Sequence, residues 1–358
     1  MLNFLELEEY TLVIPGPDDI SWYERNMAYA GELNRGFLKT VTDPPKGGRL
    51  SGSFIYAHPP DYIGRHTMNW GVAEWQDLFR EMKEMGIDTV IYQAAVWLEV
   101  KESYYPSKLF PDFKTWDSVG SLCEASARED MMLYLGGLGN LMCFDWNATA
   151  ETFQRDRDAQ LACFQEIKSL YEGGFQGFYM SPETGYPGAR QPEREVLLNQ
   201  YFRQVCEGVK AEMPDLPILM SPGTYYMKGH DQDIYDFLVG IFKDCPVDYM
   251  APQDSIGTFG NQLPHLDTSF EIWSRVCESL GFTFWVNAES FERVKIGTSL
   301  DFVSADFNRL AIQLSTANKY AEKIISWEVP YFYSELAGER GVELRKAYIE
   351  SLIKGERE

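Results

Sequence analysis

The chain has 358 residues, of which 45% are hydrophobic and 15% aromatic, so it can bury one large core or two small ones. This composition excludes a disordered or fibrous protein. The 32 basic and 54 acidic residues give a net charge of −22, which is repelled by nucleic-acid phosphates and by anionic lipid. We therefore expect neither nucleic acid nor a membrane as a partner, and charge alone sets no oligomeric state.

The N-terminal segment, MLNFLELEEYTLVIPG, carries acidic residues where a secretory signal would carry basic ones. No apolar run reaches the roughly 18 residues that a membrane span needs. The six cysteines are scattered without a CxxC pair and are predicted to be reduced thiols in the core. These features predict a cytoplasmic protein, with a processed secreted form as the alternative.

The first 45 or so residues lack clear periodicity and contain turn-forming residues at Pro15 to Pro17 and again around Pro44. We interpret residues 1–48 as an extension that packs on a main domain of residues 49–358. From Gly52 onward, short apolar runs alternate with amphipathic stretches, as in proteins built from alternating strands and helices.

Eight apolar runs are candidate strands, and their nearly continuous apolar character is typical of parallel strands covered by helices. They are Ser53–His58, Thr89–Ala94, Met131–Gly136, Gly177–Met180, Pro217–Ser221, Val247–Pro252, Thr283–Asn287 and Ile324–Trp327. Eight such strands, spread over about 300 residues, predict a (β/α)8 TIM barrel. The rival fold is an open doubly wound sheet, but the turn after the first strand, HPPDYIGRHTMNW, lacks the glycine-rich pattern of a nucleotide site.

The segments between the strands carry apolar residues at helical spacing and residues that begin or end helices. Pro192 is expected in a first helical turn, and Gly86 and Gly281 are expected where helices stop. Ser304 is expected to cap the helix that follows it. A last helix, at about residues 338–353, completes the series.

Two glutamates follow strands on opposite sides of the predicted barrel. Glu183 follows the fourth strand in GFQGFYMSPETG, and Glu289 follows the seventh in FTFWVNAESFE. The active sites of TIM barrels lie at these carboxyl ends. Glycoside hydrolysis needs two facing carboxyls, one that protonates the departing oxygen and one that attacks the anomeric carbon or activates water. We therefore predict that Glu183 and Glu289 are catalytic, with Glu183 kept protonated near neutral pH by burial and the neighbouring carboxylate, and Glu289 kept ionised by hydrogen bonds.

Other polar and aromatic residues near the strand ends are predicted to bind a sugar, because amides and acids bond its hydroxyls and aromatic planes stack on its C–H faces. They are His58, Gln93, Tyr179, Tyr225, Tyr226, Gln253, Asp254, Asn287, Trp327 and Glu328. Asp254 has two further interpretations, as a residue that orients Glu289 or as a cap of the following loop. We predict no cofactor and no metal site.

Four ordered segments resemble a known family: WGVAEWQDLFREMKEMGIDTVIYQ, GFYMSPETG, APQDSIG and WVNAESFE. They are similar to an incompletely characterised bacterial family of glycoside-hydrolase-like TIM barrels related to clan A glycoside hydrolases. The resemblance covers about residues 65–330 and implies Glu183 as acid/base and Glu289 as nucleophile. Clan A enzymes usually have Asn before the acid/base, where this chain has Pro182; Asn287 or Gln253 would then hold the sugar 2-hydroxyl.

Together these features predict a glycoside hydrolase that acts on an oligo- or polysaccharide, with retention of configuration. Two alternatives stay open. One is a metal-dependent sugar isomerase or epimerase, which would use the carboxylates as ligands. The other is a carbohydrate-binding barrel without catalysis, which is favoured if the two carboxyls lie far apart or are held in ion pairs.

Overall fold

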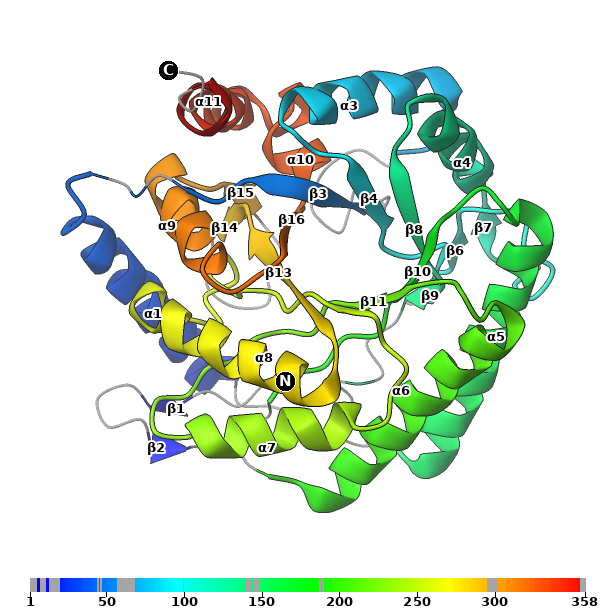
Figure 1. The fold of residues 1–358 in the computed structure, drawn as a ribbon, viewed down its shortest axis with the longest axis horizontal. Helices are drawn as coiled ribbons and strands as arrows, with labels where there is room; N and C mark the ends of the chain where they lie inside the picture. Colours follow the sequence, from blue (N-terminus) through cyan, green and yellow to red (C-terminus); the bar gives the residue numbers. More distant parts are fainter. Residues whose placement is uncertain are drawn as a thin grey trace.

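The computed structural model is a closed parallel barrel with helices around it (Figure 1). The residues that it describes are 5–6, 11–12, 20–43, 45, 47–56, 68–98, 100–139, 143, 148–186, 188, 190–294 and 302–354. Side chains of residues 5–6, 11–12, 20–26 and 336 are not among those described.

All eight predicted segments overlap a strand of the barrel, and the predicted TIM fold is confirmed. In chain order the strands are β3 (Leu50–Ile55), β4 (Thr89–Tyr92), β8 (Met132–Gly136), β10 (Gly177–Met180), β11 (Ile218–Met220), β12 (Tyr249–Met250), β13 (Thr283–Glu289) and β16 (Lys323–Trp327). Each pairs in parallel with the next, and β16 pairs with β3 to close the barrel. Hydrogen bonding extends beyond the ends of β11 and β12, because Gln253 forms parallel bridges with both Gly223 and Asn287.

The helices surround the barrel, as the amphipathic segments predict. They are α1 (Ile20–Leu38), α3 (Val72–Glu84), α4 (Ser118–Arg128), α5 (Ala150–Tyr171), α6 (Pro192–Glu212), α7 (Asp231–Phe242), the 3-10 helix η2 (Leu263–His265), α8 (Leu266–Leu280), α9 (Phe307–Ala317), α10 (Val329–Phe332), the 3-10 helix η3 (Glu335–Ala337) and α11 (Glu339–Tyr348), which continues into the π-helix η4 (Ile349–Lys354). Pro192 begins α6, and Gly281 ends α8 with a left-handed φ of 74°.

The capping prediction for Ser304 is wrong. Asp306 caps α9, and its side chain accepts hydrogen bonds from the backbone N–H groups of Asn308 and Arg309. Ser304 instead ends β15 (Phe302–Ser304), which pairs with β14 (Phe291–Arg293) in a hairpin. The hairpin lies directly after Glu289 and belongs to the mouth of the barrel.

Two further small sheets lie outside the barrel. A four-stranded sheet is formed by β5 (Val96–Trp97), β6 (Glu102–Ser103), β7 (Lys114–Thr115) and β9 (Leu138–Gly139). The short strands β1 (Leu5–Glu6) and β2 (Thr11–Leu12) pair with each other. The sequence did not predict helix α1 in the N-terminal extension, because that segment has no clear apolar periodicity.

The barrel interior holds one apolar residue from each strand or its immediate end. These residues are Phe54, Ile91, Tyr134, Tyr179, Leu219, Ala251, Trp285 and Ile325. A larger core lies between the barrel and its helices, and it contains the buried face of α3. All six cysteines are buried and none forms a disulfide. The interior ring fixes which side of each strand faces the barrel axis, since side chains alternate along a strand.

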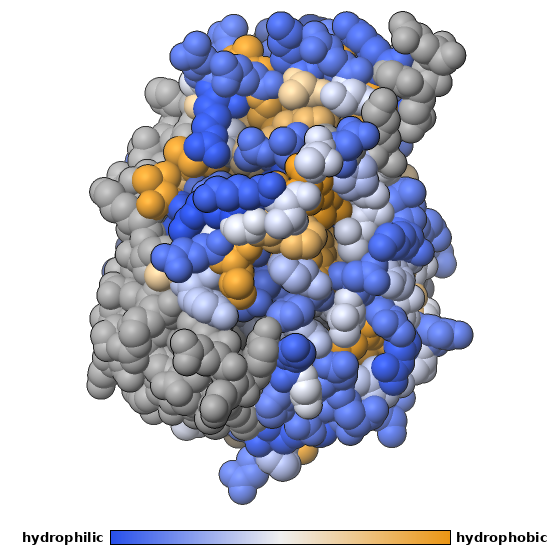
Figure 2. Space-filling view, turned by 90° about the vertical axis from the view of Figure 1, so that its left-hand side faces the viewer, coloured by the Kyte–Doolittle hydropathy of each residue, from blue (hydrophilic) through white to orange (hydrophobic). Residues whose placement is uncertain are grey.

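The face that Figure 2 turns toward the viewer is mostly hydrophilic, with short hydrophobic strips between charged and polar residues. Within the described part of the chain, none of the helices combines the length and the apolar character that crossing a membrane requires.

Candidate active site

The floor of the candidate site is the layer of side chains two residues beyond the apolar interior ring. Strand alternation places these residues on the inner side as well. They are Tyr56, Gln93, Gly136, Ser181, Ser221, Gln253, Asn287 and Trp327. The interior therefore changes from an apolar ring to a layer of amides, hydroxyls and aromatic rings at the carboxyl ends of the strands.

Hydrogen bonds connect this floor from strand to strand. The Trp327 indole donates to the Gln93 side-chain oxygen at 2.9 Å, and the Ser181 hydroxyl donates to the Gln93 carbonyl at 2.8 Å. On the other side, the Asn287 amide donates to the Ser221 hydroxyl at 3.1 Å, and the Gln253 amide donates to the Ser221 carbonyl at 3.0 Å. The side-chain oxygen of Asn287 is buried and has no partner, so it can accept a hydrogen bond.

Glu183 lies one alternation step above Ser181, on the inner side of the fourth barrel strand. The Gly223 N–H donates to the Thr184 carbonyl at 2.9 Å, so this segment stays paired with the next strand beyond β10. Glu183 is partly exposed, and its carboxylate accepts a hydrogen bond from Gln253. Burial raises the pKa of Glu183 to about 7, although the Gln253 bond favours the charged form. The side chain can therefore carry a proton near neutral pH, as a general acid must.

Glu289 lies one step above Asn287, on the inner side of the seventh barrel strand, and is only 2% exposed. Its carboxylate is held by Thr258 in the loop after β12. The Thr258 N–H donates at 2.7 Å, and the Thr258 hydroxyl lies 3.2 Å from both carboxylate oxygens. These donors fix the orientation of the carboxylate and favour its charged form.

The backbone of Glu289 is fixed on both sides by buried residues. Its N–H donates to the Asp254 carboxylate at 3.3 Å. Its carbonyl accepts from the Arg309 guanidinium at 3.0 Å and from the Gln313 amide at 3.2 Å. Gln313 also donates to Asp254 at 2.5 Å, and Arg309 also donates to the Phe291 carbonyl at 2.6 Å. Helix α9 thus anchors the end of β13 through two polar side chains.

The protonation of Glu289 differs from the sequence-based expectation that hydrogen bonds keep it ionised. Burial and the nearby negative charge of Asp254 raise the pKa of Glu289, while the Thr258 hydrogen bonds and the Arg309 charge oppose this rise. Burial also raises the pKa of Asp254, against its hydrogen bond from Gln313. The expected hydrogen bonds are present, but desolvation outweighs them because the site is more deeply buried than the sequence indicated.

Aromatic side chains form one wall of the site. The ring of Tyr56 lies 5.2 Å from that of Trp97 and 5.9 Å from that of Trp327. Behind Trp327 lies Phe291 of the β14–β15 hairpin, with ring centroids 5.1 Å apart. Trp327 is partly exposed, so part of its ring can meet a sugar.

The other predicted binding residues lie in different surroundings. His58 is outside the described residues. Tyr179 belongs to the apolar interior ring and is 1% exposed, so it lies beneath Glu183. Asp254 is fully buried under α9, and both its oxygens are bonded to the chain, which fits its alternative interpretation as a residue that orients Glu289.

Glu328 is also fully buried. It accepts a hydrogen bond from the Tyr56 N–H at 2.6 Å, and its second oxygen has no partner. Burial raises the pKa of Glu328 well above its ordinary value, against the hydrogen bond from the Tyr56 N–H. The Trp327–Glu328 peptide bond is cis. The Glu328 carboxyl thus contacts the backbone at Tyr56, which follows the neighbouring strand β3.

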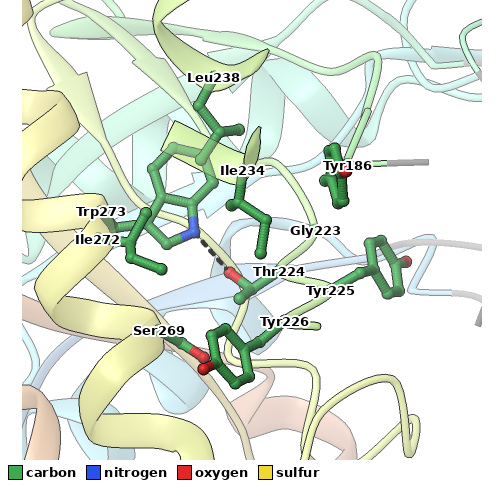
Figure 3. Close-up of a pocket in the computed structure, with 10 residues that line it drawn as sticks. All are labelled: Tyr186, Gly223, Thr224, Tyr225, Tyr226, Ile234, Leu238, Ser269, Ile272 and Trp273. Atoms are coloured by element: carbon green, nitrogen blue, oxygen red, sulfur yellow. Dashed lines mark hydrogen bonds between the residues drawn. The ribbon is translucent and has the colours of Figure 1, made fainter. Parts of the chain in front are cut away.

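Tyr225 and Tyr226 lie beside a pocket of about 260 Å³, open solvent included, between α7, α8 and the loop after β11. Figure 3 shows Trp273 and Ile272 on one side of it and the rings of Tyr186 and Tyr225 on the other. The Trp273 indole donates to the Thr224 hydroxyl at 2.9 Å. Neither Glu183 nor Glu289 lines this pocket, which is apolar and separate from the carboxylates. The ring of Tyr225 packs where Gly185, Gly223 and Gly260 have no Cβ.

Sequence reasoning missed Thr258, Arg309 and Gln313. Thr258 lies in a loop, and a loop threonine gives no sequence signal of what it contacts. Arg309 and Gln313 are four residues apart on the buried face of an otherwise apolar helix, and this polar stripe was a usable signal. Among the described residues, no group of three or more His, Cys, Asp or Glu side chains is arranged to hold a metal ion.

Fold and site define a class: a closed TIM barrel with a carboxyl group at the ends of its fourth and seventh strands. The family model described as "Domain of unknown function (DUF4434)" matches residues 50–336, and the chain belongs to this family. The predicted membership of a family of glycoside-hydrolase-like TIM barrels is thereby confirmed. No curated protein matches the chain.

Solved structures with the same fold include glycoside hydrolases. A "putative alpha-L-fucosidase" from Bacteroides thetaiotaomicron VPI-5482 is 23% identical, with a TM-score of 0.70 over 87% of this chain and 96% of that one. A GH113 beta-1,4-mannanase is 12% identical, with a TM-score of 0.51 over 86% of this chain and 100% of that one. At these identities the likeness concerns the fold.

Proposed function

We propose that the protein is a glycoside hydrolase in which Glu183 is the acid/base and Glu289 is the nucleophile. The observation that supports this most is the pair of carboxyls on the inner side of strands four and seven, above a floor of amides, hydroxyls and aromatic rings. The shared fold with glycoside hydrolases supports the same class. Fold alone does not specify chemistry, so the proposal depends on these two side chains.

The reaction has two steps. Glu183 donates its proton to the glycosidic oxygen while a Glu289 oxygen attacks the anomeric carbon; the bond to the leaving group breaks and a glycosyl ester forms on Glu289. Glu183, now charged, then takes a proton from water as that water attacks the anomeric carbon. The ester bond breaks, the sugar leaves with retained configuration, and both carboxyls return to their first state.

The exposure of Glu183 and the fixed geometry of Glu289 support this division of roles, whereas the raised pKa of Glu289 means that only part of the protein has Glu289 ionised at neutral pH. Glu183 is partly exposed and has a pKa near 7, so it can exchange its proton with leaving group and water. Glu289 is held through its carboxylate and its backbone, which suits a nucleophile that must meet one carbon atom in a defined direction. If Glu289 acted instead as the base of an inverting enzyme, it would need space beside it for the attacking water.

We propose a carbohydrate as the substrate. The free oxygen of Asn287 can accept from a sugar hydroxyl, and the partly exposed ring of Trp327 offers an aromatic plane, with the buried rings of Tyr56 and Trp97 packed around it. Among the described residues, neither Glu183 nor Glu289 takes part in an ion pair of 4.0 Å or less, so this feature does not favour a non-catalytic barrel.

The test is a panel of chromogenic glycosides that includes α-L-fucosides and β-D-mannosides. We expect the wild type to cleave at least one glycoside and the Glu183→Gln and Glu289→Gln variants to lose about 10²- to 10⁴-fold in turnover. Glu195→Gln is the matched control, since Glu195 is a buried glutamate on α6 that pairs with Arg190. Product configuration, read by NMR, should be retained.

Wild-type rates in both Gln variants on a cleaved glycoside would overturn the assignment of the two residues. Inverted product would leave the hydrolase class intact but would make Glu289 a base for water. Binding of oligosaccharides without cleavage would support the non-catalytic barrel instead.

A further inference from the structure

The loop that holds the Glu289 carboxylate adopts a conformation that its own residues do not favour. It runs from Gln253 to Gln262, between β12 and η2. Ser255 and Phe259 have φ values of 54° and 62°, in the left-handed region that side chains with a Cβ rarely adopt. Such conformations persist when surrounding structure stabilises them. Phe259 directly follows Thr258, so whatever holds Phe259 also positions the donor to Glu289.

Helix α1 supplies that support through apolar packing. The Phe259 ring is 4% exposed and packs with Met27 and Ala30 of α1 in a separate buried cluster. Gly31 lets the helix come close, because a Cβ at this position would lie 3.3 Å from the Phe259 ring. The loop residue with the unfavourable backbone therefore has its side chain anchored in the N-terminal helix.

A second link is formed by Asn34, which is 3% exposed. Its side-chain oxygen accepts from the Leu263 N–H at 2.7 Å, and its amide donates to the Asn261 carbonyl at 3.4 Å. Asn261 in turn donates to the Ser255 and Asp254 carbonyls at 2.9 and 3.2 Å. In Figure 1, α1 lies on the same side of the barrel as α8, and α1 contacts η2, the element that follows this loop.

We propose that helix α1, which precedes the matched family domain, is a functional part of the active site: through Met27 and Asn34 it positions the Thr258 loop and thereby orients Glu289. This inference rests on the proposed function. Met27, Asn34 and Phe259 are positioning residues, since they act through the loop whose Thr258 donates hydrogen bonds to the carboxylate. The loop packs closely against β14, as shown by Gly257, where an added Cβ would collide with the Phe291 carbonyl.

The expected consequence is a change in the ionisation of Glu289. The two Thr258 donors favour its charged form, so a looser loop raises the pKa of Glu289 further. The charged groups that face Glu289 from its neighbours are Asp254, next to β12, and Arg309 on α9, and both keep their contacts when α1 is altered. The nucleophile must be ionised, so the acid limb of activity should move to higher pH.

The test uses the full chain with two independent changes on α1, Asn34→Leu and Met27→Ala. We expect each to lower kcat about tenfold with little change in KM, and to move the acid limb of kcat/KM up by about one pH unit, as loss of a charge-assisted hydrogen bond predicts. Backbone amides of residues 255–263 should exchange hydrogen faster. Met27→Leu, which keeps the apolar contact, should restore all three properties.

The matched control is Asn199→Leu. Asn199 lies on α6, away from α1, and ties α6 to the C-terminal end of α7. Its amide donates to the Ile241 and Lys243 carbonyls at 3.3 and 2.8 Å. If Asn34→Leu and Met27→Ala lower stability as this control does and leave the pH profile unchanged, α1 is only structural and the proposal is overturned.

A separate measurement distinguishes failure of the proposed function. If the wild type cleaves no glycoside, the carboxyl carbon of Glu289 can still be titrated by NMR in protein labelled with 13C-glutamate, with Glu289→Gln to assign the signal. A higher pKa in Asn34→Leu and Met27→Ala than in wild type supports the positioning role without any substrate. An unchanged pKa together with unchanged exchange of residues 255–263 overturns it.

Discussion

The ends of β10 and β13 carry the same functional group in contrasting surroundings. Glu183 is partly exposed and receives one side-chain hydrogen bond, from Gln253. Glu289 is almost fully buried and is held at its carboxylate by Thr258, at its N–H by Asp254 and at its carbonyl by Arg309. One carboxyl can exchange protons with its surroundings, and the other is fixed in position.

Under the proposed function, this difference would let one barrel give two tasks to two glutamates. An acid/base works repeatedly on a leaving group and on water, so it needs access to both. A nucleophile must be aligned with one atom, so rigidity matters more than access. Experiments that separate the two environments should therefore separate the two roles.

The largest effect is expected from truncating each of the two glutamate side chains to the methyl group of alanine. With a dinitrophenyl glycoside of a cleaved sugar, Glu289→Ala should lose about 10⁴-fold in kcat, as loss of a nucleophile does. Glu183→Ala should lose less than about 10²-fold, because a good leaving group needs little protonation. Added azide should accelerate both variants and give glycosyl azides of opposite anomeric configuration. Equal losses in the two variants would contradict the division of roles.

The next largest effect concerns the anchor on α9. Arg309→Met removes a donor from the Phe291 carbonyl and one of the two donors to the Glu289 carbonyl, and it removes a buried cation that acts on Asp254. We expect the free energy of unfolding to fall by about 3 kcal/mol, measured in urea at pH 7. Arg345→Met, which removes exposed pairs with Glu81 and Glu84, should cost less than about 1 kcal/mol. Similar losses in both would show that the buried anchor is not special.

A smaller effect is expected from Asp254→Asn. The negative charge of Asp254 raises the pKa of Glu289, so its removal should lower that pKa and move the acid limb of kcat/KM down by about one pH unit. The variant replaces one acceptor oxygen of Asp254 by a donor, so it also loses a hydrogen bond, either from Gln313 or from the Ile256 and Glu289 N–H groups. An acid limb that stays in place would show that Glu289 does not set it.

The smallest effect should come from Gln253→Ala, on the other side of the comparison. The Gln253 amide favours the charged form of Glu183, so its loss should raise the pKa of Glu183. Activity needs protonated Glu183, so the basic limb of kcat/KM should move to higher pH by less than about one unit. A shift of the acid limb instead would assign Gln253 to the environment of Glu289.

Much of the barrel could be predicted from local pattern. The eight apolar runs all contain barrel strands, because a strand buried on both faces needs apolar residues throughout. Alternation then placed Glu183 and Glu289 on one side, since the side-chain period of two does not depend on the rest of the fold. Helix α1 was not predicted, and the Ser304 cap was predicted wrongly, because local signals are weak in both segments and tertiary packing decides their structure.

The sequence by itself determined the barrel and the pair of strand-end carboxyls, because period and length are local properties of the chain. Only the tertiary structure decided the environment of each carboxyl. Thr258 and Arg309 are distant from Glu289 in the chain and contact it only in the folded barrel, and Asn34 lies in a segment without a clear pattern and contacts the end of the loop that holds Glu289. Burial, which sets the pKa of Glu289, is likewise a property of the whole fold and not of any segment.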